Sequence, residues 1–159
     1  AGAKMLYTDI SSRRLARVVS EFGGTVIEGD DFYAAQADVL APCAIGGIIN
    51  GRTIPMIQAP IIAGGANNQL DDEGRDGASV AERGIVYAPD YVINAGGIIS
   101  VATEYLAKAE GRRVDVAEVN ALIAQIPGRL EAIWQESEST GFTADVVADR
   151  MAQKLIGRA

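Results

Sequence analysis

Histidine is absent from this chain, and cysteine occurs once, at Cys43. Without histidine, the chain has no Ser-His-Asp or Cys-His catalysis, no histidine-ligated zinc and no imidazole proton shuttle. A single cysteine excludes an internal disulfide, and we expect Cys43 to be a small buried residue rather than a nucleophile. Lysine is confined to Lys4, Lys108 and Lys154, none of them in a glycine-rich turn, so we assign no catalytic lysine.

Long apolar runs and a basic leader segment are missing as well. Their absence predicts no membrane span and no signal peptide, and it makes the cytoplasm the expected location. The net charge of −7, from 21 acidic and 14 basic residues, argues against a nucleic-acid partner, because such partners require clustered basic side chains. The 159 residues, 48% of them hydrophobic, fit one globular domain with a core of ordinary size.

Strand-like and helix-like segments alternate along most of the chain. This alternation is typical of an α/β fold, in which helices cover a sheet of parallel strands. Ser11 or Ser12 is expected to cap the first helix, Gly23 to stop it and Thr53 to cap a short helix further on. The expected strands are 5–7, 25–27, 37–40, 60–63 and 85–88, and the expected helices between them are 11–22, 54–57 and 76–83.

The last part of the chain is predicted to be helical. Asp115 and Glu118 resemble a capping box, and apolar residues follow them at helical spacing. Pro127, with the glycine after it, is expected to kink or divide that helix, and Thr143 is expected to cap a final one. Terminal helices of this kind pack across their own domain or against a neighbouring one.

The segment 87–102 joins a short apolar strand to an apolar helix through an amide and two glycines. The amide offers a hydrogen-bond donor and an acceptor, the glycines remove side chains where a ligand could approach, and two apolar residues stand one helical turn apart. These residues are Asn94, Gly96, Gly97, Ile98 and Val101. We interpret the segment as the wall of a binding site. The alternative is a helix whose glycine pair packs closely against a neighbouring element.

Two further segments have the same character. Residues 61–70, IIAGGANNQL, leave an apolar strand through a glycine pair and then present three amides. Residues 41–47, APCAIGG, follow the strand-like run 38–40 in a similar way. This repetition favours the binding-site interpretation of segment 87–102.

Asp9 ends the first expected strand. An acidic side chain at the end of the second strand of a dinucleotide-binding sheet binds the hydroxyls of the adenine ribose, which favours NAD over NADP. Because Arg13 and Arg14 are basic, binding of NADP through its 2′-phosphate stays open as an alternative. A helix-capping role for Asp9 is the alternative to ribose binding.

The glycine-rich phosphate turn of such a sheet belongs about 20 residues before this acid. Only eight residues precede Asp9. We therefore expect a Rossmann-type doubly wound parallel sheet that lacks its first strand and phosphate loop, in a chain that is the C-terminal part of a longer polypeptide. Residues 1–110 are expected to form this incomplete dinucleotide-binding domain, and residues 111–159 the C-terminal helices.

Four ordered motifs carry a resemblance to a known family. They are TDI at 8–10, APCAIGGIING at 41–51, IAGGANNQL at 62–70 and ERGIVYAPDYVINAGGIISVA at 82–102. Together they resemble the coenzyme domain of the glutamate/leucine/phenylalanine/valine dehydrogenase family, and within it the leucine and phenylalanine dehydrogenase branch. The resemblance runs from about residue 3 to the C-terminus.

The resemblance implies a reversible, NAD-dependent oxidative deamination. In this reaction the α-carbon of an amino acid gives a hydride to the nicotinamide, and the resulting imine is hydrolysed to a 2-oxo acid and ammonia. The resemblance implies that Asp9 and Ile10 contact the adenine ribose of the coenzyme. It also implies that Cys43 and Ala44 line the adenosine side, and that Ala66 and Asn67 contact the nicotinamide ribose.

The substrate pocket that the resemblance implies lies in segment 87–102. Asn94 is expected to face the reaction cleft, beside Gly96 and Gly97, and Ile98 and Val101 to line the pocket for the substrate side chain. Both lining residues are apolar, which disfavours glutamate, because an unpaired buried carboxylate costs several kcal/mol. Leucine, valine, isoleucine and phenylalanine remain as substrates.

The family's substrate-binding lysines and their partner aspartate belong to an N-terminal substrate domain that is not in this chain. The chain alone is therefore expected to be inactive and to bind NAD poorly, and the whole protein to be a homo-oligomer with no metal site. Two alternatives stay open, a binding module that senses NAD without chemistry and a reductase of another small carbonyl compound. The apolar pair beside Asn94 argues against the first, whereas fold alone does not separate the second.

Overall fold

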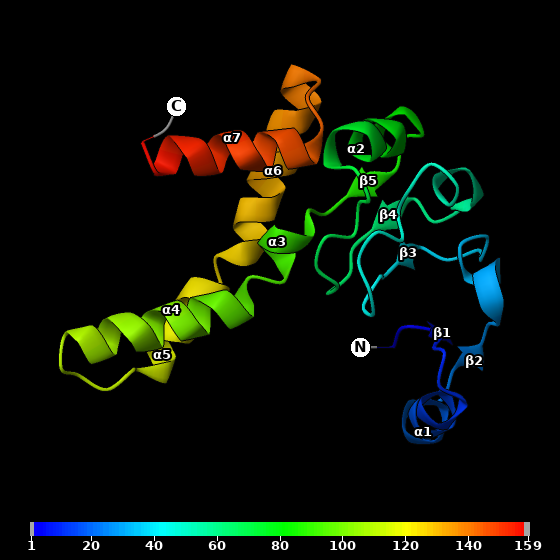
Figure 1. Ribbon diagram of the computed structural model, residues 1–159, viewed down its shortest axis with the longest axis horizontal. Coiled ribbons are helices and arrows are strands. Elements are labelled where there is room, and N and C mark those ends of the chain that lie inside the picture. Colours follow the sequence, from blue (N-terminus) through cyan, green and yellow to red (C-terminus); the bar gives the residue numbers. More distant parts are fainter. Residues whose placement is uncertain (1, 158–159) are drawn as a thin grey trace.

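The computed structural model describes residues 2–157, in which short strands lie at one side of the molecule and the helices of residues 96–155 extend to the other (Figure 1). The strands are β1 (Leu6–Tyr7), β2 (Thr25–Val26), β3 (Val39–Leu40), β4 (Ile61–Ile62) and β5 (Val86–Tyr87). The α-helices are α1 (Ser12–Phe22), α2 (Glu73–Glu82), α3 (Asp90–Ile93), α4 (Gly96–Ala109), α5 (Val116–Ile123), α6 (Ile126–Thr140) and α7 (Ala144–Leu155). Two short 3₁₀ helices, η1 (Gly29–Phe32) and η2 (Ile54–Met56), complete the described elements.

Every strand pair is parallel, which confirms the α/β fold class. β1 pairs with β2, and β3, β4 and β5 follow one another in a second sheet. In the register of the second sheet, Ile61 lies between Val39 and Val86. The strands thus form two sheets rather than one continuous sheet, because no described strand is hydrogen-bonded between β1 and β3.

The first two helices begin at side chains that bind their free backbone N–H groups. Ser11 is the cap of α1, since its hydroxyl accepts the Arg14 N–H at 3.4 Å. The carboxylate of Asp72 accepts the Arg75 N–H at 2.9 Å, so α2 begins three residues earlier than the predicted start at residue 76. Thr53 does precede η2 as predicted, but its hydroxyl donates to the Ile48 carbonyl at 2.6 Å instead of capping that helix.

The helical end of the chain is divided as expected, although at a different place. α5 ends at Ile123, and Pro127 lies in the first turn of α6, where a missing N–H costs no intrahelical bond. Asp115 caps α5 by accepting the Ala117 N–H at 2.8 Å. The predicted capping box does not form, because the Glu118 carboxylate lies 2.9 Å from the Arg112 guanidinium instead.

The hydrophobic core lies under the second sheet. Ile62 of β4 and Tyr87 of β5 are buried there with Val80 of α2 and with the segment around η2. By contrast, α1 buries no residue, and Leu6 and Val26 of the first sheet are each at least 40% exposed. The second sheet is therefore the well-packed part of the molecule.

The C-terminal helices make a smaller core beside the second sheet. Ile133 of α6 packs with Val147 and Ala148 of α7, and α6 also contacts α3. α4 and α5 form a hairpin that extends away from the strands (Figure 1). Within residues 2–157, no helix is long and apolar enough to span a bilayer.

Candidate functional site

The predicted site residues follow the carboxyl ends of the strands. Cys43 comes after β3, Asn67 after β4, and Asn94 after β5 and the short α3. Because parallel strands end at the same edge of their sheet, these three loops share one edge, which is where open α/β sheets bind their ligands. Asp9 follows β1 and therefore lies at an end of the other sheet.

The loops after β3 and β4 approach each other closely enough to require glycine. The Pro42 carbonyl accepts the Ala66 N–H at 2.9 Å, and a Cβ atom on Gly64 would collide with the Pro42 backbone. A Cβ atom on Gly46 would lie 2.6 Å from the carbonyl oxygen of Asn67. Two glycines thus let the two loops form one surface.

Cys43 and Ala44 lie exposed on this surface. The expectation that Cys43 is buried is wrong, because its loop has already left the strand and reached the rim of the sheet. The thiol accepts a weak hydrogen bond from the Gly65 N–H at 3.5 Å. Ala66, in contrast, is buried, and both its N–H and its carbonyl are hydrogen-bonded within the protein.

Asn67 and Asn94 meet directly across the edge. The Asn94 Nδ2 donates to the Asn67 Oδ1 at 2.6 Å, although 27 residues separate the two in the sequence. Asn67 is exposed and Asn94 is half-buried. Their mutual hydrogen bond does not use the side-chain carbonyl of Asn94 or the side-chain NH₂ of Asn67. The pair therefore offers a ligand one acceptor and one donor side by side.

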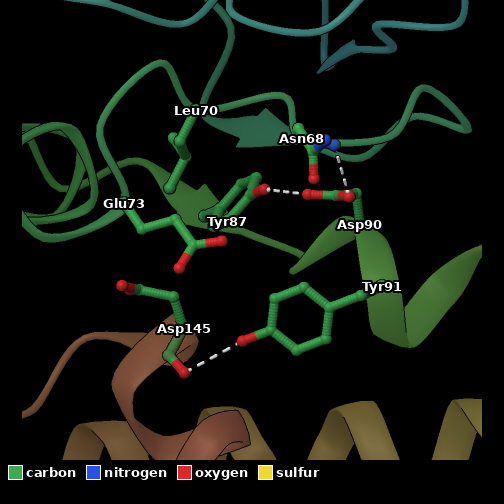
Figure 2. A pocket seen from close by; sticks show the side chains of 7 residues that line it. All are labelled: Asn68, Leu70, Glu73, Tyr87, Asp90, Tyr91 and Asp145. Atoms are coloured by element: carbon green, nitrogen blue, oxygen red, sulfur yellow. Dashed lines mark hydrogen bonds between the residues drawn. The ribbon is translucent and has the colours of Figure 1, made fainter.

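Behind this pair lies a buried carboxylate that sequence reasoning did not select. The Asp90 Oδ1 accepts the Tyr87 hydroxyl at 2.9 Å, and its Oδ2 accepts the Asn68 N–H at 2.9 Å (Figure 2). Burial, with the neighbouring Asp90 carboxylate, raises the pKa of the Tyr87 hydroxyl well above its ordinary value. The sequence offers only a weak signal for Asp90, an acidic residue two positions after the expected strand 85–88.

The loop after β4 is stabilised by hydrogen bonds from a buried side chain. The buried Gln69 side chain donates to the Gly64 carbonyl at 2.6 Å and to the Ala66 carbonyl at 3.0 Å. Asn68 is the single non-glycine residue with positive φ, 52°, in the described part of the chain. The amide-rich loop is thus a fixed structure rather than a pliable one.

Asp9 and Ile10 are not in contact with the other predicted residues. The Asp9 Oδ1 accepts the Ser11 N–H at 2.7 Å, and its Oδ2 lies 3.5 Å from the Arg14 Nη1. Asp9 therefore holds the turn before α1, whereas Ser11 is the residue that caps the helix, and part of the Asp9 carboxylate stays accessible. The Ile10 side chain is fully exposed.

Ile98 and Val101 lie on the exposed side of α4, at 68% and 62% exposure. Gly96 and Gly97 open the same helix; a Cβ atom on Gly96 would meet only Ile123, at 3.8 Å. On Gly97 a Cβ atom would have no described atom within 4 Å. The alternative of a glycine pair packed closely against a neighbour therefore has no support in residues 2–157.

The donor set of this edge is made of amides, backbone groups and carboxylates. In the part of the chain that the structure describes, no group of three or more histidine, cysteine, aspartate or glutamate residues is arranged to hold a metal ion. The lysines lie outside these loops, at Lys4, Lys108 and Lys154. The edge is therefore suited to hydrogen bonding with a neutral or hydroxyl-rich ligand.

The sequence pattern of the glutamate/leucine/phenylalanine/valine dehydrogenases matches residues 4–158. The chain belongs to this family. The relatives named below are amino-acid dehydrogenases.

Individual relatives cover almost the whole chain. Leucine dehydrogenase from Geobacillus stearothermophilus is 44% identical over 155 residues, which are 98% of this chain and 40% of that protein. Phenylalanine dehydrogenase from Lysinibacillus sphaericus is 39% identical over 161 residues, which cover 98% of this chain and 40% of that protein. The crystal structure of L-tryptophan dehydrogenase from Nostoc punctiforme superimposes with a TM-score of 0.87 at 38% identity, over 98% of this chain and 46% of that chain. The chain thus spans about 40% of the length of the curated relatives it matches.

Proposed function

We propose that this chain is the coenzyme-binding part of an NAD-dependent amino-acid dehydrogenase. The reaction is the reversible oxidative deamination of an apolar L-amino acid to a 2-oxo acid and ammonia. The observation that carries the proposal is the Asn67–Asn94 pair at the sheet edge. Asn94 lies in the segment 87–102, which also contains the exposed apolar residues Ile98 and Val101.

The edge fits the coenzyme in its polarity and its access. Asn67 presents an amide beside the buried Ala66, which suits the nicotinamide ribose, and the exposed Cys43 and Ala44 line the adenosine side. Asp9, with Ile10 beside it, offers a partly exposed carboxylate to the adenine ribose, and a carboxylate favours NAD over NADP. When bound, NAD supplies the hydride acceptor, and these residues orient it.

The substrate class follows from the apolar helix face. Ile98 and Val101 present hydrocarbon next to Asn94, with no charged partner for a substrate carboxylate among these residues. A glutamate side chain would lose its hydration there without compensation, whereas leucine, valine, isoleucine or phenylalanine would gain from burial. A single methylene discriminates by only about 1–3 kcal/mol, so the proposal names the class rather than one amino acid.

The proposal also includes the rest of the protein. Among the described strands, β1 pairs only with β2 and β3 only with β4, so each has one free edge, and Leu6 of β1 is exposed. One more parallel strand, followed by its phosphate loop, would join the two sheets. This supports residues 1–110 as an incomplete dinucleotide-binding domain and residues 111–159 as helices that pack on it or toward a substrate domain.

The exposed apolar residues of the α4–α5 hairpin support the proposal that a neighbouring domain or subunit packs against it. Tyr105 and Leu106 of α4 and Val116 of α5 are each more than half exposed. We propose that the full-length protein covers them in a homo-oligomer and supplies the catalytic lysines from its substrate domain. The single cysteine supports the expected cytoplasmic location.

The experiment is a product balance on the full-length protein. With an apolar L-amino acid and NAD, we expect NADH, 2-oxo acid and ammonia in equal amounts, and no turnover by the 159-residue chain alone. Binding of NAD with no turnover of any amino acid would favour the NAD-sensing module. Oxidation of NADH by a carbonyl compound without ammonia, together with no turnover of amino acids, would favour a reductase of another carbonyl compound.

A further inference from the structure

Asp90 is connected to both sides of the Asn67–Asn94 pair. Its side chain accepts the N–H of Asn68, the residue after Asn67, at 2.9 Å. Its main-chain carbonyl accepts the N–H of Asn94 itself at 2.8 Å. One residue thus holds the backbone next to one amide and the backbone of the other.

We infer that Asp90 is a positioning residue, which sets the Asn67 and Asn94 amides for coenzyme and substrate without touching either. The inference rests on the proposed function. It adds a residue that neither the motifs nor the family resemblance selected.

The bond to Asn68 controls a conformation that the chain does not adopt readily. Asn68 has φ of 52°, in the left-handed region that costs free energy for residues other than glycine, and asparagine tolerates it best. A hydrogen bond from a backbone N–H to a carboxylate is among the stronger ones, and here it is largely removed from water because Asp90 is 6% exposed. Loss of this bond would let the chain at Asn68 turn and carry the Asn67 side chain away from Asn94.

The carboxylate is itself held in place. The Tyr87 hydroxyl donates to its Oδ1 at 2.9 Å, and the Trp134 Nε1 of α6 donates to the Tyr87 carbonyl at 2.8 Å. Figure 2 shows the Asp90 carboxylate between the Tyr87 hydroxyl and the Asn68 nitrogen. The chain of bonds therefore runs from helix α6 to the amide pair at the sheet edge.

The surroundings of Asp90 exclude direct chemistry with a ligand. The cavity that it lines with Asn68, Tyr87 and Tyr91 measures about 10 Å³, which is room for one water molecule. Both carboxylate oxygens already accept hydrogen bonds from the protein. Asp90 therefore acts through its neighbours.

Asp76 provides a matched control for a purely structural role. It is also a buried aspartate, and its carboxylate accepts hydrogen bonds from the Arg75 guanidinium at 2.9 Å and from the Asp72 N–H at 2.9 Å. It lies within α2 and has no hydrogen bond to the amide pair. Loss of Asp76 should lower stability in the same way as loss of Asp90, but without moving Asn67 or Asn94.

The experiment compares kcat/KM for an apolar amino acid in the full-length protein and its variants, at a temperature at which all are folded. Asp90→Ala is expected to lower kcat/KM by about 10²-fold, the typical effect of misplacing a reacting group by about 1 Å. Asp90→Asn is expected to restore most of this loss, because its amide still accepts the Asn68 N–H. Asp76→Ala is expected to lower the thermal midpoint and leave kcat/KM unchanged. Equal kcat/KM in Asp90→Ala and Asp76→Ala overturns the inference.

Two further measurements test the positioning role of Asp90 if kcat/KM of Asp90→Ala cannot be measured. If Asp90→Ala does not fold, Tyr87→Phe takes its place, and an unchanged kcat/KM in that variant overturns the inference. If no amino acid supports NAD reduction by the wild-type protein, the proposed function fails. The positioning role is then tested by crystal structures of the wild type, Asp90→Asn and Asp90→Ala. There, an Asn67–Asn94 hydrogen bond that persists in Asp90→Ala overturns it, and a pair that separates in Asp90→Ala and persists in Asp90→Asn supports it.

Discussion

The side-chain amide of Asn94 donates a 2.6 Å hydrogen bond to the side-chain carbonyl of Asn67. The bond joins the loop after β4 to the end of α3, at the edge where parallel strands present their carboxyl ends. It brings together a residue implied in coenzyme binding and one implied in facing the substrate. The proposed reaction requires this proximity, because hydride transfer needs the two ligands in contact.

Replacement of Asn94 by alanine tests the role of this pair. The change removes one hydrogen bond to Asn67 and one amide from the reaction cleft, a loss of about 1–3 kcal/mol, or roughly 5- to 150-fold in kcat/KM. Steady-state kinetics of the full-length protein measure it. Gln58→Ala, at an exposed position after η2, is the control and should behave as wild type. Equal activity of both variants would contradict the assignment.

The neighbouring glycines Gly64 and Gly65 give opposite predictions. A Cβ atom on Gly64 would collide with the Pro42 backbone, whereas one on Gly65 would have no described atom within 4 Å. Gly64→Ala is therefore expected to destabilise the protein by about 1–3 kcal/mol or more through overpacking, and Gly65→Ala to have little effect. Chemical denaturation of both variants measures the difference in the free energy of unfolding. Similar values for the two would show that the β3 and β4 loops are not packed as described.

The proposed function assigns the Asp9 carboxylate to the hydroxyls of the adenine ribose, a role that would favour NAD over NADP. The Arg14 guanidinium lies 3.5 Å from this carboxylate and partly offsets its charge. Asp9→Ala is expected to lower kcat/KM for NAD and to shift the ratio of kcat/KM values toward NADP, because the arginines then face a 2′-phosphate without opposing charge. Arg17→Ala, whose side chain pairs with Glu21, is the matched control. A ratio that stays constant in Asp9→Ala would exclude Asp9 from the adenosine site.

Much of this arrangement was predictable from the sequence, and the reasons differ from residue to residue. The apolar runs that became β3, β4 and β5, and Ser11 as a cap, follow from local pattern and hydrogen-bonding chemistry. The position of Asn67 and Asn94 in loops after strands was predictable because glycine and amide follow an expected strand in each case. Their direct contact was not, since it depends on how two loops 27 residues apart pack together.

Other features depend on contacts that no local pattern contains. Cys43 was expected to be buried because cysteine usually is, but its loop lies on the rim of the sheet. Glu118 suits a capping box, yet the Arg112 guanidinium forms an ion pair with it instead. Asp90 was overlooked because its two partners, Tyr87 and Asn68, meet it only in the folded protein.

The stability of the fold is expected to depend on pH through Asp76. The hydrogen bonds from the Arg75 guanidinium, aided by the Asp72 N–H, hold the pKa of this carboxyl below its ordinary value of about 3.9, despite burial. A depressed pKa stabilises the folded state above the unfolded pKa, and the stabilisation is lost as the pH falls through the lower, folded value. Thermal midpoints of wild type and Asp76→Asn should therefore differ at pH 7, and the difference should shrink progressively as the pH falls below about 3.9. A difference that persists unchanged in acid would contradict this assignment.

The most direct test of the central claim is the substrate preference of the full-length protein with NAD. The apolar residues Ile98 and Val101 predict that kcat/KM for leucine, valine or phenylalanine exceeds that for glutamate by about 10²-fold or more, since burying an unpaired carboxylate costs several kcal/mol. Oxidation of these apolar amino acids, with glutamate close to background, is the predicted result. Equal or better turnover of glutamate, or no NAD reduction with any amino acid, would contradict the account.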